Sequence, residues 1–416
     1  MAGVRRADYT LGHGSTGFRV AHYDLELDYK LAPNRLTARA VLSAVADSEL
    51  ARIPLDLAGL TVKGVRVDGR PAKFTHRGGK LVVRPARPVR GEFTVEVRYA
   101  GNPRPVASRW GEIGWDELTD GALVASQPTG APSWFPCNDR PGDKATYRVA
   151  LTTASAYTVL VTGDLVARRA GGSATTWVFQ RREPTAPYLM SVQIGRYESL
   201  ELGPGQRIAV PRRLRDAAAH DFGRQPEMLR VLGEWFGPYP FGEYVVVVTD
   251  DDLDDPIEAQ GMAIFGGNHV DGRRTFERLV VHELAHQWFG NSLTVAGWRH
   301  IWLNEGFATY AEWLWSEASG GAPAEEHARE WRSRVGTDVP IGDPGEAHLF
   351  DEQVYKRGAL TLHALRGRVG DAVFFPMLRS WVAGHTHGTV TTEEFIAHAE
   401  RAAGVPLRED FAVWLG

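Results

Sequence analysis

Apolar and polar residues alternate with a period of two along much of the first half of the chain. Segments 23–29 and 92–99 place apolar side chains at every second position, which is typical of strands with one buried face. Asp68-Gly69 and Gly78-Gly79 lie between such runs and indicate tight turns. Further strand-like stretches are 147–152, 157–162, 176–180 and 190–194. Strands this closely spaced predict an antiparallel β-sandwich or a saddle-shaped sheet.

The pattern changes near residue 203, where Gly203-Pro204-Gly205 has the composition of a linker. Beyond it, apolar residues recur at helical spacing, interrupted by one buried-strand run at 244–249. The helical stretches are 221–236, 275–289, 304–318, 353–369, 372–383 and 392–403. We therefore predict a multidomain α+β protein, with an N-terminal β-domain over residues 1–202 and a mostly α domain over residues 203–416.

Composition narrows the class of protein. The 416 residues are 43% hydrophobic and 24% charged, as in ordinary globular proteins. A net charge of −4 carries no basic excess, so we expect no nucleic-acid partner. A single cysteine, Cys137, excludes an intramolecular disulfide and fits a reducing compartment. No run approaches the ~18 apolar residues of a membrane span, and residues 1–20 lack the apolar run of a signal peptide. We expect a cytoplasmic protein.

The clearest chemical signal is His282-Glu283-Leu284-Ala285-His286, an H-E-x-x-H pattern inside an apolar helical run. On a helix the two histidines share a face, so both imidazoles can reach one zinc ion, and Glu283 projects toward the attacking water. A catalytic zinc site needs a third protein ligand. Glu305 follows His286 with eighteen residues between them and opens a second predicted helix. It completes a His₂Glu set, the ligand set of many zinc hydrolases.

The segments VVHELAHQWFGNSLT and WLNEGFATYAEWLW resemble the aminopeptidase N family of gluzincin zinc metallopeptidases, which includes the leukotriene hydrolases. The resemblance implies a thermolysin-like catalytic domain after a β-domain. In that family a G-x-M-E-N loop contributes a Glu that binds the substrate's α-amino group, and Glu258 matches it here. The family's Gly and Asn are replaced by Asp255 and Ala259.

Two further segments carry the same resemblance. Tyr355-Lys356-Arg357-Gly358 matches a Y-x-K-G motif whose Tyr stabilises the oxyanion, with Arg357 in place of Lys. Residues 126–131 and 134–147 match the family's β-domain signature, and Gln127 falls where relatives place a Glu or Gln near the substrate amine. Many relatives carry a further helical C-terminal domain, for which this chain leaves no room, so the resemblance is to a short form.

The resemblance implies a zinc aminopeptidase with one Zn²⁺ per chain and peptides with a free N-terminus as substrates. Water would attack the first peptide bond with Glu283 as general base, Tyr355 would stabilise the oxyanion, and Glu258 with Gln127 would hold the ammonium group. One alternative is an epoxide hydrolase on the same site, as in the leukotriene branch. Another is a non-catalytic zinc-binding scaffold, against which the intact Glu283 and Tyr355 argue.

Several of these residues also have a purely structural interpretation. Tyr355 could be a core aromatic residue, and Glu258 could be a solvated loop acid. Glu312, seven residues after Glu305, could orient a zinc-bound histidine or lie on the surface. Cys137 is more typical of packing than of a nucleophile. Five acids at 250–255 could favour cationic substrates, although a solvated loop is the commoner explanation.

Overall fold

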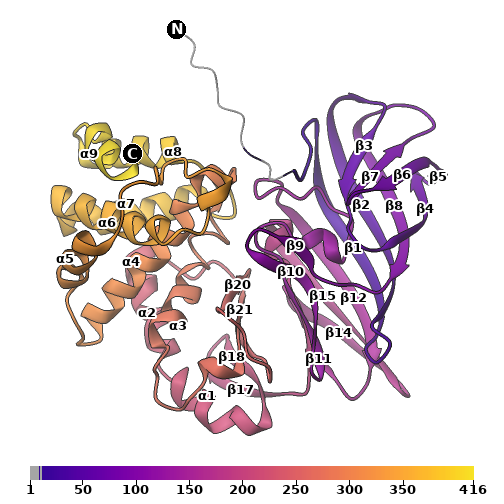
Figure 1. The fold of residues 1–416 in the computed structure, drawn as a ribbon, viewed down its shortest axis with the longest axis horizontal. Coiled ribbons are helices and arrows are strands. Elements are labelled where there is room, and N and C mark those ends of the chain that lie inside the picture. Colours follow the sequence, from indigo (N-terminus) through magenta and orange to yellow (C-terminus); the bar gives the residue numbers. More distant parts are fainter. Residues whose placement is uncertain (1–8, 10–11) are drawn as a thin grey trace. The chain divides into compact units, whose positions relative to one another are not determined.

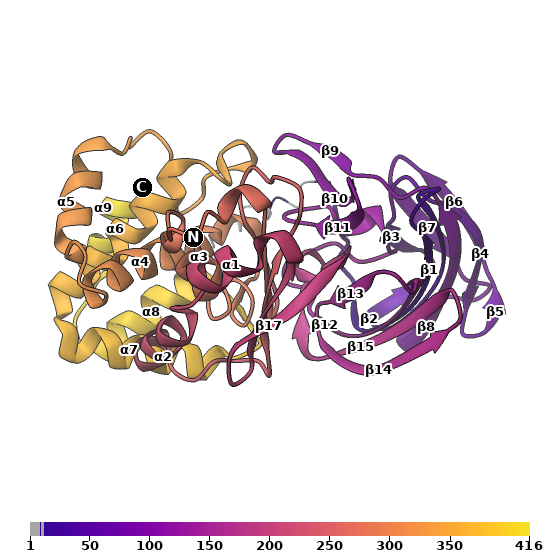
Figure 2. The same cartoon turned by 90° about the horizontal axis from the view of Figure 1, so that it is seen from below.

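The computed structural model describes residue 9 and residues 12–416. Its internal contacts define two units, each built from separate stretches of the chain (Figures 1 and 2). A β-rich unit comprises residues 13–220 and 241–273, and a helical unit comprises 221–240 and 274–416. The predicted domain boundary at 202/203 falls inside strand β17 (Tyr197–Gly203) and stays a prediction. Half of residues 1–20, over which no signal peptide is predicted, lie outside the described residues.

The largest element of the β-rich unit is an eight-stranded sheet of order β14-β15-β12-β1-β2-β8-β4-β5. All its pairs are antiparallel except β1 with β12, which run parallel. Its alternating sequences bury one face, as the period-two pattern predicts. The strands are β1 (Phe18–Lys30), β2 (Arg35–Leu50), β4 (Thr61–Val67), β5 (Arg70–Pro71), β8 (Val89–Gly101), β12 (Ala145–Ala154), β14 (Asp164–Gly171) and β15 (Ala174–Thr185).

Three smaller sheets complete this unit. A five-stranded sheet has the order β13-β16-β11-β10-β9, and a three-stranded sheet the order β3-β7-β6. A second five-stranded sheet, β17-β18-β19-β21-β20, contains the predicted strand at 244–249 as β19. The additional strands are β3 (Ile53–Asp56), β6 (Lys73–Arg77), β7 (Lys80–Arg84), β9 (Val106–Ser108), β10 (Gly111–Leu118), β11 (Gly121–Ala125), β13 (Thr158–Val161), β16 (Val192–Gly195), β18 (Gln206–Pro211), β19 (Tyr244–Val248), β20 (Ile257–Ala259) and β21 (Met262–Phe265).

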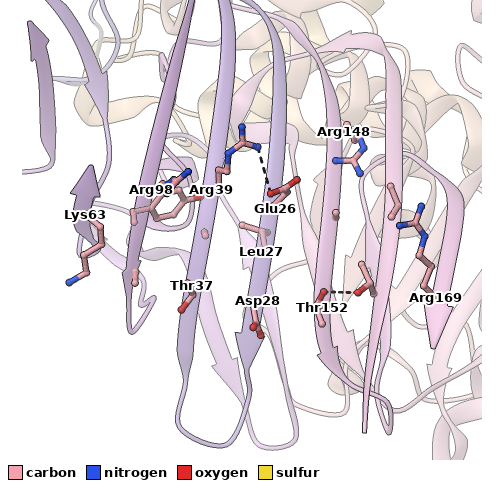
Figure 3. A pocket seen from close by; sticks show the side chains of 16 residues that line it. Glu26, Leu27, Asp28, Thr37, Arg39, Lys63, Arg98, Arg148, Thr152 and Arg169 are labelled. Atoms are coloured by element: carbon pink, nitrogen blue, oxygen red, sulfur yellow. Dashed lines mark hydrogen bonds and ion pairs between the residues drawn. The ribbon is translucent and has the colours of Figure 1, made fainter. Parts of the chain in front are cut away.

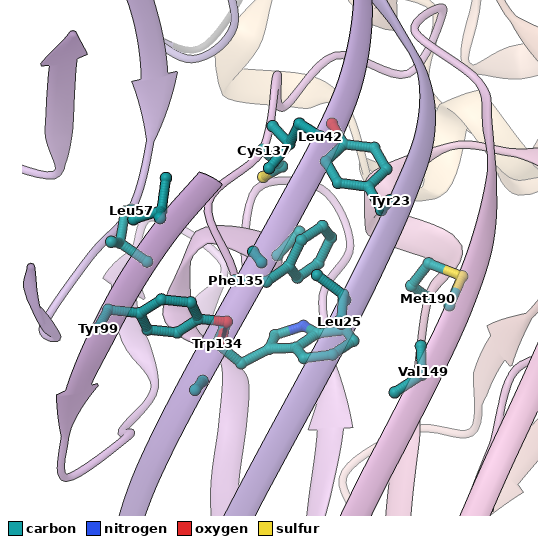
Figure 4. Close-up of a cluster of buried hydrophobic side chains, with 14 of the residues drawn as sticks. Tyr23, Leu25, Leu42, Leu57, Tyr99, Trp134, Phe135, Cys137, Val149 and Met190 are labelled. Atoms are coloured by element: carbon teal, nitrogen blue, oxygen red, sulfur yellow. Dashed lines mark hydrogen bonds between the residues drawn. The ribbon is translucent and has the colours of Figure 1, made fainter. Parts of the chain in front are cut away.

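The core of the β-rich unit is aromatic and includes the single cysteine (Figure 4). Tyr23 and Tyr147 stack with ring centroids 4.8 Å apart, and Phe135 meets Tyr23 edge to face at 5.4 Å. The Tyr99 hydroxyl donates to the main-chain oxygen of Trp134 at 3.0 Å, so this buried polar group is satisfied. Trp134, Phe135 and Cys137, from the segment that follows β11, are therefore part of the core.

The helical unit consists mainly of α-helices, with longer connections at 286–301 and 335–351. The predicted helices all occur, and helices α1, α5 and α9 were not predicted. The helices are α2 (Gln225–Phe236), α3 (Glu277–Ala285), α4 (Trp302–Ala318), α5 (Ala324–Arg334), α6 (Glu352–Val369), α7 (Asp371–His385), α8 (Thr392–Ala403) and α9 (Arg408–Leu415). Helix α1 (Arg215–Asp221) belongs to the β-rich unit except for its last residue. Strand β22 (Thr294–Val295) pairs with β23 (Thr389–Val390). These observations confirm the predicted α+β class.

No helix in the described part of the chain is long and apolar enough to cross a membrane.

Candidate metal centre and active site

Helix α3 places the two histidines of the H-E-x-x-H pattern on one face. His286 caps the helix one turn after His282, and their ring centroids lie 4.8 Å apart. Val281 and Leu284 on the same helix are fully buried, which fixes α3 within the core of the unit. As a result the two imidazoles are also buried, with 7% of His282 and 1% of His286 exposed.

Glu305 reaches the same point from α4, which packs against α3. Its Oε2 lies 3.4 Å from Nε2 of His286 and 3.7 Å from Nε2 of His282. Tetrahedral ligands about 2.1 Å from a zinc ion are separated from each other by about 3.4 Å. The three buried side chains therefore fit one zinc ion, and the predicted His₂Glu set is brought together by the fold.

The Nδ1 atom of each imidazole is engaged in a hydrogen bond, which leaves Nε2 as the nitrogen available to a metal ion. Nδ1 of His286 lies 3.0 Å from the main-chain oxygen of Phe289, and Nδ1 of His282 lies 2.7 Å from Oε1 of Glu312. Both partners only accept, so each Nδ1 carries the hydrogen and each Nε2 keeps its lone pair for a metal. Glu312 is 8% exposed, so the structure favours the orienting role over the surface role.

The electrostatics of this cluster favour a bound cation. Burial alone would lower the pKa of His282, but hydrogen bonds with Glu305 and Glu312 raise it to about 9. Burial would raise the pKa of Glu305, yet the charge of His286 and the bond from His282 hold it well below its usual range. Two carboxylates therefore surround His282, and the second oxygen of Glu312 lies 3.5 Å from Nη1 of Arg278.

Tyr355 lies in the first turn of α6, beside the histidines. Its ring is nearly parallel to that of His282, with an interplanar angle of 19° and centroids 6.1 Å apart. Arg357, two residues on, anchors this turn by donating to the main-chain oxygens of Val339 at 2.6 Å and Trp414 at 2.8 Å. Arg357 itself therefore fixes this turn, at the position where the Y-x-K-G motif has Lys.

The close approach of α4 and α6 depends on two glycines. A Cβ on Gly306 would lie 2.7 Å from the Cα of Gly358, and a Cβ on Gly358 would lie 2.6 Å from the Cα of Gly306. No other residue fits at either position without moving a helix. Gly306 follows Glu305, and Gly358 lies three residues after Tyr355, so this contact sets the spacing of the two helices that carry these candidate site residues.

Glu283 lies between the two histidines on α3 and is 4% exposed. It is not part of the set formed by His282, His286 and Glu305. A buried carboxylate next to this set of side chains is suited to proton transfer.

The predicted amine-binding residues belong to the β-rich unit. Glu258 lies in β20, and its Oε1 accepts a hydrogen bond of 2.7 Å from Nε2 of Gln127. Glu258 is 7% exposed, so it is not a solvated loop acid. The two residues are 131 positions apart in sequence, and the fold pairs them as the resemblance implied.

The acidic segment 250–255 is mostly exposed. Asp250 forms an ion pair with Arg213, and Asp251 accepts a hydrogen bond of 2.6 Å from the Thr119 amide. Steering of cationic substrates by this segment stays a prediction. Cys137 is buried, and burial raises the pKa of its thiol well above the usual range, as expected of a packing residue and not of a nucleophile.

Two family models cover most of the chain. The Peptidase family M1 domain matches residues 221–414, and the Peptidase M1 N-terminal domain matches residues 20–189. The chain belongs to peptidase family M1. An M1 zinc metallopeptidase from Deinococcus radiodurans superimposes with a TM-score of 0.88 at 32% identity, over 98% of this chain and 96% of that one. A mutant of that enzyme has been crystallised with a Tyr-Ser-Ala substrate.

The curated relatives are longer than this chain. Leukotriene A-4 hydrolase of Xenopus laevis is 26% identical over 91% of this chain and 67% of its own length. Aminopeptidase M1 of Arabidopsis thaliana is 24% identical over 70% of this chain. The M1 chain described here thus matches only 36% of the plant enzyme's length. These relatives confirm the resemblance to the aminopeptidase N and leukotriene hydrolase family.

Three residues that hold the candidate site residues in place were not predicted from the sequence. Arg278, Gly306 and Gly358 were not singled out, although both glycines stand inside the quoted motifs. The available signal was their position: each glycine interrupts an otherwise helical run next to a functional residue, which indicates close packing.

Proposed function

We propose that this M1 chain is a zinc-dependent aminopeptidase that holds one Zn²⁺ through His282, His286 and Glu305. The observation that carries the proposal is the set of three buried ligand atoms together with the hydrogen bonds that direct both Nε2 atoms toward Glu305. A scaffold that merely bound zinc would not need an unliganded buried carboxylate at Glu283 or a tyrosine stacked beside His282.

When bound, zinc supplies Lewis-acid activation of the scissile carbonyl and lowers the pKa of water. Glu283 accepts a proton from the attacking water, whose oxygen forms the new bond to the carbonyl carbon. Glu283 then returns that proton to the leaving nitrogen as the C–N bond breaks. The proton count balances, and the carboxylate is regenerated for the next turnover.

Tyr355 donates its hydroxyl hydrogen to the oxyanion, an interaction that becomes strongest in the transition state. Glu258 pairs with the substrate ammonium group, and the amide of Gln127 holds the Glu258 carboxylate in place. Because this anchor recognises a free amine, it fixes the first peptide bond as the one that is cut.

Hydrolysis of amino-acid amides and short peptides, with and without a chelator, tests the proposal. We expect activity that a chelator abolishes and zinc restores. Glu283→Gln should abolish turnover while the protein still contains zinc by elemental analysis. Retained activity in this variant would overturn the base assignment, and an inert wild-type protein that contains zinc would favour the scaffold.

N-acetylated versions of the same substrates test the amine anchor. We expect no hydrolysis of them, because Glu258 has no ammonium group to bind. A preference for Arg- and Lys-amides over Leu- and Ala-amides would support steering by segment 250–255, and equal rates would exclude it. Turnover of a lipid epoxide without amide hydrolysis would favour the epoxide hydrolase.

A further inference from the structure

A groove with a volume of about 610 Å³ crosses the eight-stranded sheet of the β-rich unit. Its lining includes small side chains such as Thr37, Ala100 and Ala150. Five cationic side chains and two acidic ones line it (Figure 3). The cations are Arg39, Lys63, Arg98, Arg148 and Arg169, and the acids are Glu26 and Asp28.

Two of these arginines face each other across neighbouring strands. Arg39 of β2 and Arg98 of β8 are direct partners in the register of the sheet. Like charges placed opposite each other destabilise a sheet. Glu96 offsets the repulsion by accepting from Nη2 of Arg39 and from Nε of Arg98, both at 3.0 Å. Nη1 of Arg39 also lies 3.6 Å from Oε2 of Glu26 (Figure 3), so both arginines have carboxylate partners that hold them side by side.

The charges of the groove are only partly balanced. Nη1 of Arg148 donates to Oδ1 of Asp24 at 2.7 Å, so this arginine has a partner. Among the described residues, neither Lys63 nor Arg169 has an ion-pair partner, and both are exposed. These two cations stand on β4 and β14, at opposite sides of the sheet, with the paired arginines between them (Figure 3).

The separation of Lys63 and Arg169 sets the length of a ligand that meets both. Six strand spacings lie between β4 and β14 in the order of the sheet. At about 4.8 Å each, they amount to about 29 Å. An extended polypeptide needs about nine residues to cover that distance.

The lining favours a polypeptide over a nucleic acid. Single-stranded nucleic acids bind to exposed aromatic rings, but Tyr99 is the only aromatic residue of this lining and is 1% exposed. Glu26 and Asp28 can accept hydrogen bonds from the main-chain N–H groups of a peptide, and a phosphodiester backbone has no such donors.

We propose that this groove binds an extended acidic polypeptide segment of about nine residues that lies across the strands. Its carboxylates would pair with Lys63 and Arg169 at the two ends and with the arginines between them. The site lies within the β-rich unit, so the proposal is independent of the aminopeptidase activity.

Fluorescence anisotropy with a labelled, N-acetylated decaglutamate peptide tests it on the full chain. The acetyl group removes the free amine that an aminopeptidase site would recognise. We expect saturable binding of decaglutamate, none of N-acetylated decaglutamine, and weakening with added salt. In the variant Lys63→Ala/Arg169→Ala, binding should weaken at least fivefold, with the thermal unfolding midpoint unchanged because both residues are exposed and unpaired.

The matched control is Lys73→Ala/Arg77→Ala, which removes one exposed lysine and one exposed arginine from β6, outside the groove. This variant should bind decaglutamate as tightly as the unsubstituted chain. A loss of less than fivefold in the groove variant or an equal loss in the control would overturn the proposal. So would tighter binding of a ten-nucleotide single-stranded DNA, or no binding of decaglutamate.

Discussion

Gly306 of α4 and Gly358 of α6 meet main chain to main chain, at a distance that leaves no space for a side chain on either. Gly358→Ala should therefore destabilise the helical unit by about 1–3 kcal/mol, because the added methyl group must push the helices apart. The same displacement should weaken zinc binding, since α4 carries Glu305. Thermal unfolding and chelator competition measure the two effects.

Gly367→Ala is the control in the same helix. A Cβ at Gly367 has no atom within 4 Å, so alanine should raise stability by about 0.5–1 kcal/mol through its helix propensity. If Gly358→Ala behaved like this control, the glycine contact would not determine the spacing of the helices.

Removal of the Glu312 carboxylate should loosen the metal site. In Glu312→Ala, His282 loses the acceptor that orients its ring, and zinc affinity should fall about 10–100-fold. Glu312→Gln keeps an acceptor oxygen, so its loss should be smaller. Competition with a coloured chelator measures the zinc affinities of both variants without any substrate.

Glu330→Ala serves as the matched control for Glu312. Glu330 forms an exposed pair with Arg334 on α5, and such pairs contribute little to stability. Zinc affinity should be unchanged in this variant. Equal affinities in all three variants would contradict the orienting role.

Tyr355→Phe separates transition-state stabilisation from binding. The variant keeps the ring beside His282 but loses the hydroxyl, so kcat should fall about 10²–10³-fold while KM and zinc content stay close to wild type. Steady-state kinetics on an amino-acid amide, with metal analysis of the same sample, gives all three values. An unchanged kcat would assign Tyr355 to packing.

Asp143 makes the stability of the β-rich unit depend on pH. Burial raises its pKa to about 6, although Asn138 and the Val20 amide donate to it. The unfolded value is about 3.9, so the folded state binds the proton more tightly. This stability contribution is fully present below about pH 4 and is lost as pH rises through 6.

Asp143→Asn mimics the protonated side chain at every pH. Relative to wild type, the variant should gain stability as pH rises from 4 to 8, by up to about 3 kcal/mol. Unfolding midpoints of both proteins at pH 4, 5, 6 and 8 measure the difference. A difference that did not change with pH would show that Asp143 does not titrate in this range.

Local patterns were enough to predict much of this molecule. The period-two runs predicted β1 and β8, and helical spacing predicted α4 and α6. H-E-x-x-H with Glu305 predicted three side chains that the fold brings together as a candidate metal site. These features depend on residues that are close in sequence or on one helix face.

Features that depend on long-range packing were not predictable in the same way. The parallel pairing of β1 with β12 joins Leu25 to Val149, and no short pattern encodes that register. The predicted helix at 275–289 ends earlier, at Ala285, because the chain then turns with bonds from Gln287 to Leu284 and from Trp288 to Ala285. Tertiary contacts override helix propensity there.

The position of Cys137 turns the chain's only thiol into an internal reporter. It is buried in the aromatic core of the β-rich unit, next to the main chain of Asp56, with which it exchanges two hydrogen bonds. A thiol reagent can reach this sulfur only when that core opens. The rate of labelling at Cys137 therefore measures the rate at which this core opens, and no engineered label is needed.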